Sequence, residues 1–194
     1  MDMKLRRTAL ASSVLIASLL LAGCSNPMQN MSMGGSPTAD ESTAAFNDAD
    51  VAFTMNMVVH HNQAIEMADV LLGKDGIDPQ VVQLARDIDA AQRPEIDLMN
   101  DWLDAWGAGG MSGMDHGMAG TMSEADMAAL GASSGDEAGR LFLEQMIVHH
   151  EGAIEMARAE LRDGESRDAI ALAEKIVTAQ TAEIAEMRDL LANA

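Results

Sequence analysis

Two pairs of adjacent histidines stand at matching places in two similar stretches of this chain. The first pair, His60 and His61, lies in MVVHHNQAIEMA, and the second, His149 and His150, lies in MIVHHEGAIEMA. A methionine precedes each pair by three residues. Imidazole nitrogens and thioether sulfurs form a soft ligand set that suits copper, above all Cu(I). The two stretches therefore indicate a copper site to which both contribute.

Glutamine and glutamate residues farther along the chain are expected to lie level with the histidines. Each histidine stretch is followed by the pattern Q..EI..M, which supplies Gln92, Glu95 and Met99 in the first case and Gln180, Glu183 and Met187 in the second. Counting back to each turn at about 1.5 Å per residue places the glutamines level with the first histidine of each pair and the glutamates level with the preceding methionine. Such a layer could hold a metal, with the glutamine and glutamate side chains orienting the rings. It could instead be a polar core layer whose members satisfy one another and fix the register of the helices.

A glycine-rich segment, MSGMDHGMAGTM, supplies further soft ligands. They are Met111, Met114, His116, Met118 and Met122. Methionines in a flexible polar loop bury little apolar surface, so core packing does not explain them. Thioethers need no deprotonation to bind Cu(I) and cannot form disulfides, which favours them over thiols outside the cytoplasm. The alternative is a low-complexity segment without a ligand.

The elements that hold these residues are predicted to be helices, because apolar residues recur at helical spacing around them. The sequence predicts an all-α protein with helices at about 48–72, 79–105 and 136–162, another reaching about 191, and a short helix after Ser123. Residues 53–70 and 142–159 are identical at ten of eighteen places, so the chain repeats a helical hairpin. The hairpins, at about 48–105 and 136–192, are joined by the methionine-rich loop 107–122. They pack most simply as a four-helix bundle over 46–194.

The N-terminal residues predict export and attachment to a membrane by lipid. Basic residues precede an apolar run over 9–22, which is too short to cross a membrane and has the layout of a signal peptide over 1–23. The run ends in Leu-Ala-Gly-Cys, similar to the bacterial lipobox, so Cys24 is the expected lipidation site. Residues 24–45 then form a flexible tether, and the protein faces the periplasm or the cell exterior. The formal charge of −19 argues against nucleic-acid partners and favours attraction of cations.

These motifs, M.VHH..AIEMA with Q..EI..M..WL..WG and its repeat, resemble the bacterial family catalogued as domain of unknown function 305 over about residues 46–193. The resemblance implies a ferritin-like four-helix fold and copper binding outside the cytoplasm, as in metallochaperones of the CopM type. The ligands it implies are Met57, His60, His61, Met67, Met146, His149, His150 and Met156. Copper sequestration or delivery would confer copper tolerance, and a copper-donor or copper-acceptor protein or a homo-oligomer is compatible with it.

Other classes of function fit the sequence less well. Di-iron oxidases of ferritin-like fold need a Glu-x-x-His pair on each of two helices, and many zinc proteases need His-Glu-x-x-His. The chain has neither pattern. We therefore expect a binding protein rather than an enzyme, and a zinc site would leave the methionines without a role. The main alternative is a structural surface lipoprotein whose histidines only organise the core.

Overall fold

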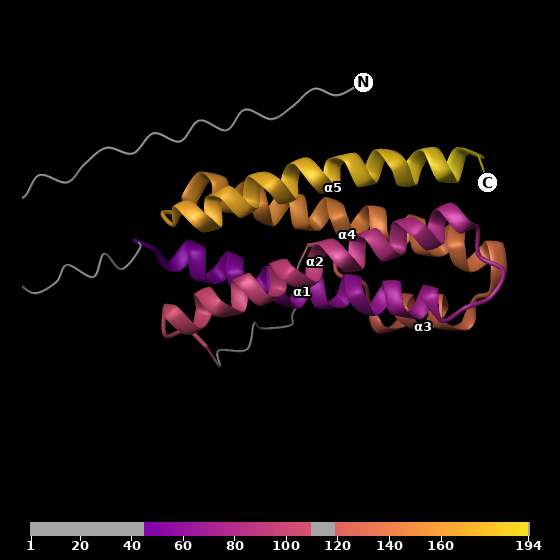
Figure 1. The fold of residues 1–194 in the computed structure, drawn as a ribbon, viewed down its shortest axis with the longest axis horizontal. Helices are drawn as coiled ribbons and strands as arrows, with labels where there is room; N and C mark the ends of the chain where they lie inside the picture. The colour runs from indigo at the N-terminus through magenta and orange to yellow at the C-terminus, as the bar shows by residue number, and fades with distance from the viewer. Residues whose placement is uncertain (1–44, 110–118, 194) are drawn as a thin grey trace, which may run out of the picture. The chain divides into compact units, whose positions relative to one another are not determined.

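The computed structural model describes residues 45–109 and 119–193. They form five helices: α1 (Asp48–Leu72), α2 (Pro79–Ala105), α3 (Glu124–Ala132), α4 (Gly135–Asp163) and α5 (Arg167–Asn193). The four long helices run side by side (Figure 1), and no strand occurs in either range. The all-α fold and the helix boundaries predicted from the sequence are confirmed, including the short helix after Ser123.

Short-range signals set where these helices begin. The Asn47 side chain caps α1 by accepting hydrogen bonds from two backbone N–H groups of the first turn, at 2.8 and 3.1 Å. The backbone N–H of Asn47 in turn donates to the Asp50 carboxylate at 2.6 Å. Ser123 and Asp126 form the same reciprocal cap on α3. Pro79 is the first residue of α2, where its missing N–H costs nothing.

The helices form two antiparallel hairpins, α1 with α2 and α4 with α5, which meet mainly through α1 and α4. The short α3 packs against α1 and α4. One end of the bundle carries the α1–α2 loop, the start of α4 and the end of α5, and the other end carries the α4–α5 turn (Figure 1). The two helices that carry the histidine pairs therefore form the contact between the hairpins.

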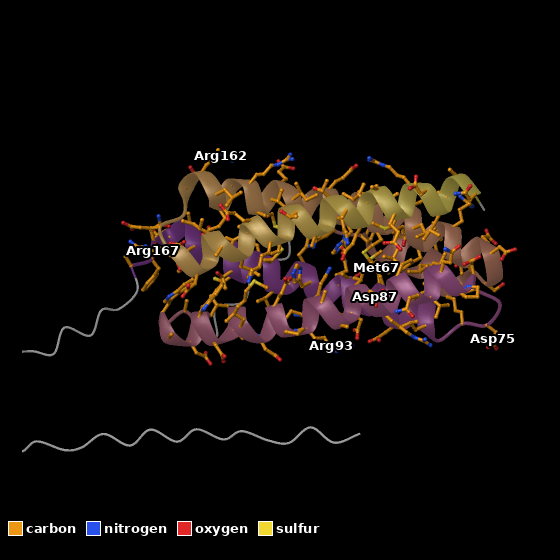
Figure 2. The ribbon with its side chains drawn as sticks, turned by 45° about the horizontal axis from the view of Figure 1, so that its top comes forward. Met67, Asp75, Asp87, Arg93, Arg162 and Arg167 are labelled. Carbon is orange, nitrogen blue, oxygen red and sulfur yellow. The ribbon has the colours of Figure 1, made fainter. Side chains whose placement is uncertain are left out.

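The interior contains two apolar clusters, one toward each end of the bundle. The loop-side cluster, toward the α1–α2 loop, includes Met67, Leu71, Leu84, Ile88, Phe142, Met146 and Met187. The turn-side cluster, toward the α4–α5 turn, includes Phe53, Met57, Met99, Leu172 and Ile176. Figure 2 shows the labelled Met67 among the helices, while labelled charged residues such as Arg93 and Arg162 lie on the outside. Methionine and aliphatic residues thus build this core with few aromatic rings.

Several predicted features lie outside the described residues. They are the signal peptide, Cys24, nearly all of the tether, and Met111, Met114, His116 and Met118. These features remain predictions. Among the helices of the described ranges, none is long and apolar enough to cross a membrane.

Candidate metal centre

The four histidines of the repeated motif form a buried polar layer between the two apolar clusters. Their exposed fractions are 0% for His60, His61 and His150 and 1% for His149. Along α1, Met57 before the pair belongs to the turn-side cluster, and residues after the pair belong to the loop-side cluster. The order is reversed along α4, which runs the other way. Four imidazoles are therefore brought to one level of the core, as the repeat predicts.

Two of these rings, His61 and His150, are each held by a glutamate from the second helix of the same hairpin. We call them the outer histidines. The Nε2 atom of His61 lies 2.8 Å from Oε2 of Glu95, and that of His150 lies 2.7 Å from Oε2 of Glu183. In a neutral ring, Nε2 then carries the proton and donates it to the carboxylate, which leaves the Nδ1 lone pair free. The Nδ1 atoms of both rings are buried and have no partner among the described residues.

The other two rings, the inner histidines His60 and His149, face each other across the contact between the hairpins. Their ring centroids lie 3.7 Å apart, and the ring planes are inclined by 37°. None of their four ring nitrogens forms a hydrogen bond of good geometry within the described part of the chain, although the Ala119 backbone lies near His60. Buried polar atoms are normally paired, so four unpaired nitrogens at one place are unusual in a core. Such a cluster is typical of residues that bind a ligand.

The inner rings are also held in the neutral state that metal binding requires. Burial, followed by the charges of His61 and His150, lowers the pKa of His60 from 6.5 to about 3, although the Ala119 backbone acts in the opposite direction. Burial and the neighbouring histidines also hold the pKa of His149 well below its ordinary value. A neutral imidazole keeps a lone pair for a metal at physiological pH. No proton then has to be displaced from these rings.

Methionine sulfurs lie on both sides of the histidine layer. Met57, Met99 and Met156 belong to the turn-side cluster, and Met67, Met146 and Met187 to the loop-side cluster. No group of three or more His, Cys, Asp or Glu side chains within the described ranges is arranged to hold a metal ion. The donors that the layer and its flanking methionines offer are imidazole and thioether, a set that suits Cu(I) better than Zn²⁺.

The register of the glutamates differs from the sequence-based expectation by about one turn. We expected Glu95 level with Met57 and Glu183 level with Met146. The structure instead bonds these carboxylates to His61 and His150, four residues farther along α1 and α4. Residue counting carries this error because it assumes that both helices start from the turn at the same height. Gln92 and Gln180 are buried as expected, but no bond from either to a ring is observed among the described residues.

One pair of residues near the layer was not recognised from the sequence. Gln63 and Gly152 occupy equivalent places in the repeat, three residues after His60 and His149, yet they differ in type. Both contact residues 119–122, the last part of the methionine-rich loop 107–122. The signal that could have revealed them is the mismatch itself, because it falls in a gap of two residues between the identical histidine pair and the identical stretch AIEMA.

A buried pair of acidic side chains, also missed from the sequence, joins the start of α1 to the end of α4. Asp50 and Glu160 are 0% and 1% exposed. Burial, then a hydrogen bond to Asp50, then the charges of Asp50 and Asp163 raise the pKa of Glu160 from 4.5 to about 8. Burial alone would raise the pKa of Asp50, but hydrogen bonds from Glu160 and three backbone groups outweigh it and lower that pKa. The Glu160 oxygens have no partner unless one is protonated, so Glu160 holds a proton that it donates to Asp50.

The fold is shared with several solved structures. A DUF305 protein of Streptomyces coelicolor, described as secreted, is 35% identical, with a TM-score of 0.69 over 75% of this chain and 93% of that one. A DUF305 fragment from Deinococcus radiodurans is 32% identical, with a TM-score of 0.70 over 76% of this chain and 98% of its own.

Copper appears in the description of a third similar protein. CopM in its Cu(I)-bound form is 30% identical, with a TM-score of 0.65 over 74% of this chain and 96% of CopM. A comparison with curated proteins finds no match. The model of DUF305, a domain of unknown function, matches residues 50–191, which cover most of the described helices. The chain belongs to the DUF305 family.

Proposed function

We propose that this protein binds copper, mainly as Cu(I), in the histidine layer of its bundle and acts by binding rather than by catalysis. The observation that carries the proposal is the inner pair, His60 and His149, whose four buried ring nitrogens have no partner in the described part of the chain. Methionine sulfurs on both sides of the layer supply the softer ligands. The similarity to CopM, which has been solved in Cu(I)- and Cu(II)-bound forms, supports the choice of metal.

Each kind of residue has a distinct role in this proposal. The inner histidines, with Met57 and Met146, bind the ion, and the outer histidines offer Nδ1 from either side. Glu95 and Glu183 orient the outer rings, as carboxylates do for metal-bound histidine. The carboxylates are about a quarter exposed, at 26% and 22%, so they also connect the layer to solvent.

The setting proposed for this activity is outside the cytoplasm. The signal sequence, the lipobox ending at Cys24 and the tether anchor the bundle to a membrane, and a Streptomyces relative is described as secreted. The acidic surface attracts cations to the protein. Sequestering copper, or passing it to another protein, would protect the cell from the metal.

The test is an anaerobic competition titration of the mature protein with Cu(I) and a chelator of known affinity. His60→Ala/His149→Ala should lose most of the affinity, and the control Asn62→Ala/Glu151→Ala, which changes the exposed residues that follow the two histidine pairs, should retain it. Replacing Met111, Met114 and Met118 by leucine measures the contribution of the loop. Unchanged affinity in the double histidine variant would show that the layer does not bind copper.

The competing function is purely structural, with the histidine layer serving to fix the register of the hairpins. The bonds from His61 to Glu95 and from His150 to Glu183 favour it, because they tie the helices of each hairpin together. This alternative predicts no change in melting temperature when Ag(I) or Cu(I) is added. Copper binding predicts a rise in melting temperature that grows with metal concentration.

A further inference from the structure

The two repeats differ where they meet residues 119–122, which we call the strap. The strap is the last part of the methionine-rich loop, precedes α3 and lies against both α1 and α4. Gln63 of the first repeat contacts it through polar atoms, and Gly152, the equivalent residue of the second, contacts it through backbone. The first hairpin therefore forms hydrogen bonds with the strap through Gln63, and the second leaves room for its backbone at Gly152.

Gln63 holds the strap by a pair of hydrogen bonds. Its Nε2 donates to the carbonyl oxygen of Met122 at 2.9 Å, and the backbone N–H of Met122 donates to its Oε1 at 2.7 Å. The Gln63 side-chain amide thus bonds to both the N–H and the carbonyl group of Met122, as a neighbouring strand does in a sheet. This satisfies the backbone polar groups of a residue that belongs to no helix.

Glycine at two places lets the strap approach α4 closely. A Cβ atom on Gly120 would lie 2.7 Å from the carbonyl oxygen of Val148 and 2.8 Å from Cα of Gly152. A Cβ atom on Gly152 would lie 2.7 Å from Cα of Gly120 and would overlap the Ala119 carbonyl. Gly120 also has a φ of +79°, a backbone conformation that other residues rarely adopt. Any larger side chain at either glycine must push the strap away from α4.

The strap lies at the same level of the bundle as the inner histidines. Val148 and Gly152 lie one residue before and one turn after His149, and Gln63 lies one turn after His60. The Ala119 backbone is near enough to His60 to affect its pKa. With the strap in place, His60 and His149 are 0% and 1% exposed. The strap thus lies beside the histidine layer, against residues of both α1 and α4.

We infer that the strap closes this side of the histidine layer, and that Gln63 and Gly152 are positioning residues which set how often it opens. The inference rests on the proposed copper binding and adds the route by which the ion arrives. Copper reaches His60 and His149 when the strap lifts from Gln63 and Gly152.

Beyond the strap lies a groove with donors suited to receive the ion. The groove has a volume of about 600 Å³ and lies between α1, the strap and α3. Met122 and Met127 line it, together with the carboxylates of Glu66 and Glu124. The carboxylates attract a cation and the thioethers bind Cu(I), so an ion held there would lie next to the segment that must move. This also gives a role to Glu66, which the repeat retains on an exposed face.

The test compares two variants that loosen the strap with a matched control. Gly152→Ala removes the space on α4, and Gln63→Leu removes both hydrogen bonds to Met122. Gly139→Ala makes the same change elsewhere on α4, where the added Cβ would meet Ile77 at an ordinary 3.6 Å. The first readout is the rate at which diethyl pyrocarbonate modifies each histidine of the full metal-free protein, followed by peptide mass spectrometry. The second is the stopped-flow rate of Cu(I) uptake.

Loss of the two hydrogen bonds should raise the open population, and with it the labelling rate of His60 and His149, by on the order of tenfold. Gly152→Ala should act in the same direction and Gly139→Ala should match the wild type, while copper uptake accelerates in both strap variants. Circular dichroism and the melting temperature show whether each variant remains folded.

The outcomes separate the strap from the proposed copper site. Unchanged labelling in both folded strap variants would overturn the inference, whether or not the protein binds copper. Faster labelling in a protein that takes up no copper would support the strap as a cover and disprove the proposed function. Faster labelling without faster uptake would show that copper reaches the layer by another side, which also overturns the inferred route.

Discussion

His60 and His149, one from each hairpin, face each other at the centre of the bundle with their ring centroids 3.7 Å apart, their planes inclined by 37°, and no hydrogen-bond partner for their ring nitrogens among the described residues. A buried polar atom without a partner costs free energy. The unpaired nitrogens therefore lower the stability of the metal-free protein, and they lie where copper is proposed to bind. Such a cost in stability is common at functional sites.

Replacing an inner histidine by leucine should stabilise the metal-free protein. His149→Leu removes two unpaired buried nitrogens and puts an apolar side chain of similar size in their place. We therefore expect the free energy of unfolding to rise by about 1 kcal/mol. The same variant should lose the rise in melting temperature caused by Ag(I). Urea denaturation without metal measures the first effect and thermal denaturation with Ag(I) the second. A clear loss of stability without metal would indicate that these nitrogens have partners.

Weakening the bond between Glu95 and His61 should reduce copper affinity without unfolding the bundle. Glu95→Gln keeps the size of the side chain but removes the charge that orients the ring, and losses of about 10- to 100-fold are typical for such partners of metal ligands. Glu186→Gln is the control for affinity at equilibrium, because Glu186 is exposed on α5 and belongs neither to the histidine layer nor to the groove. A chelator competition titration measures both variants. If Glu95→Gln binds copper as tightly as the control variant, Glu95 has no part in copper binding.

A conservative change at Met57 should separate copper binding from packing. Met57 is fully buried, and Met57→Leu preserves its volume, so the cost in stability should stay below about 1.5 kcal/mol. The loss of the sulfur should still lower the affinity for Cu(I). Met55→Leu is the matched control on the same helix, because the repeat has Glu144 at that place. If both variants bind Cu(I) like the wild type, Met57 serves only as core.

The pair Asp50 and Glu160 should make stability fall as the pH rises. The pKa of Glu160 is 4.5 in an ordinary setting and about 8 in the folded protein, so between these values the folded state holds a proton that the unfolded state has lost. Each step up in pH across this window therefore favours unfolding. Glu160→Gln can still donate to Asp50 but does not titrate. Its melting temperature should change less between pH 5 and 8 than that of the wild type, and a profile as steep as the wild type's would contradict the assignment.

The helices could be predicted because their signals are local. The cap at Asn47 and the proline at Pro79 act within one turn of the helix end, and α1 and α2 begin at the predicted residues 48 and 79. The histidine layer could be predicted because the repeat retains it while the residues around it differ. The first inference uses residues that are close together in the chain, and the second compares equivalent residues of the two repeats.

The register of the carboxylates and the strap could not be predicted in the same way. The bond from Glu95 to His61 depends on how far α2 is shifted along α1, which differs from the residue count by about one turn. The strap depends on Gly120 and Gly152, which are distant in the chain and meet only because α4 passes under the loop. A glycine in a helix lowers helix propensity, but it does not say which segment approaches it.

The face-to-face placement of His60 and His149, with ring planes inclined by 37°, also limits how a single ion can be bound by both. The lone pairs of an imidazole lie in the plane of its ring, so two rings that face each other at this distance do not direct them at one point between the faces. For both to bind one ion, at least one ring must rotate, and its neighbours on α1 and α4 must move to make room. These two helices form the main contact between the hairpins. Copper affinity and the spacing of the hairpins are then thermodynamically linked, so whatever tightens or loosens that contact changes the affinity, and the ion changes the contact in return.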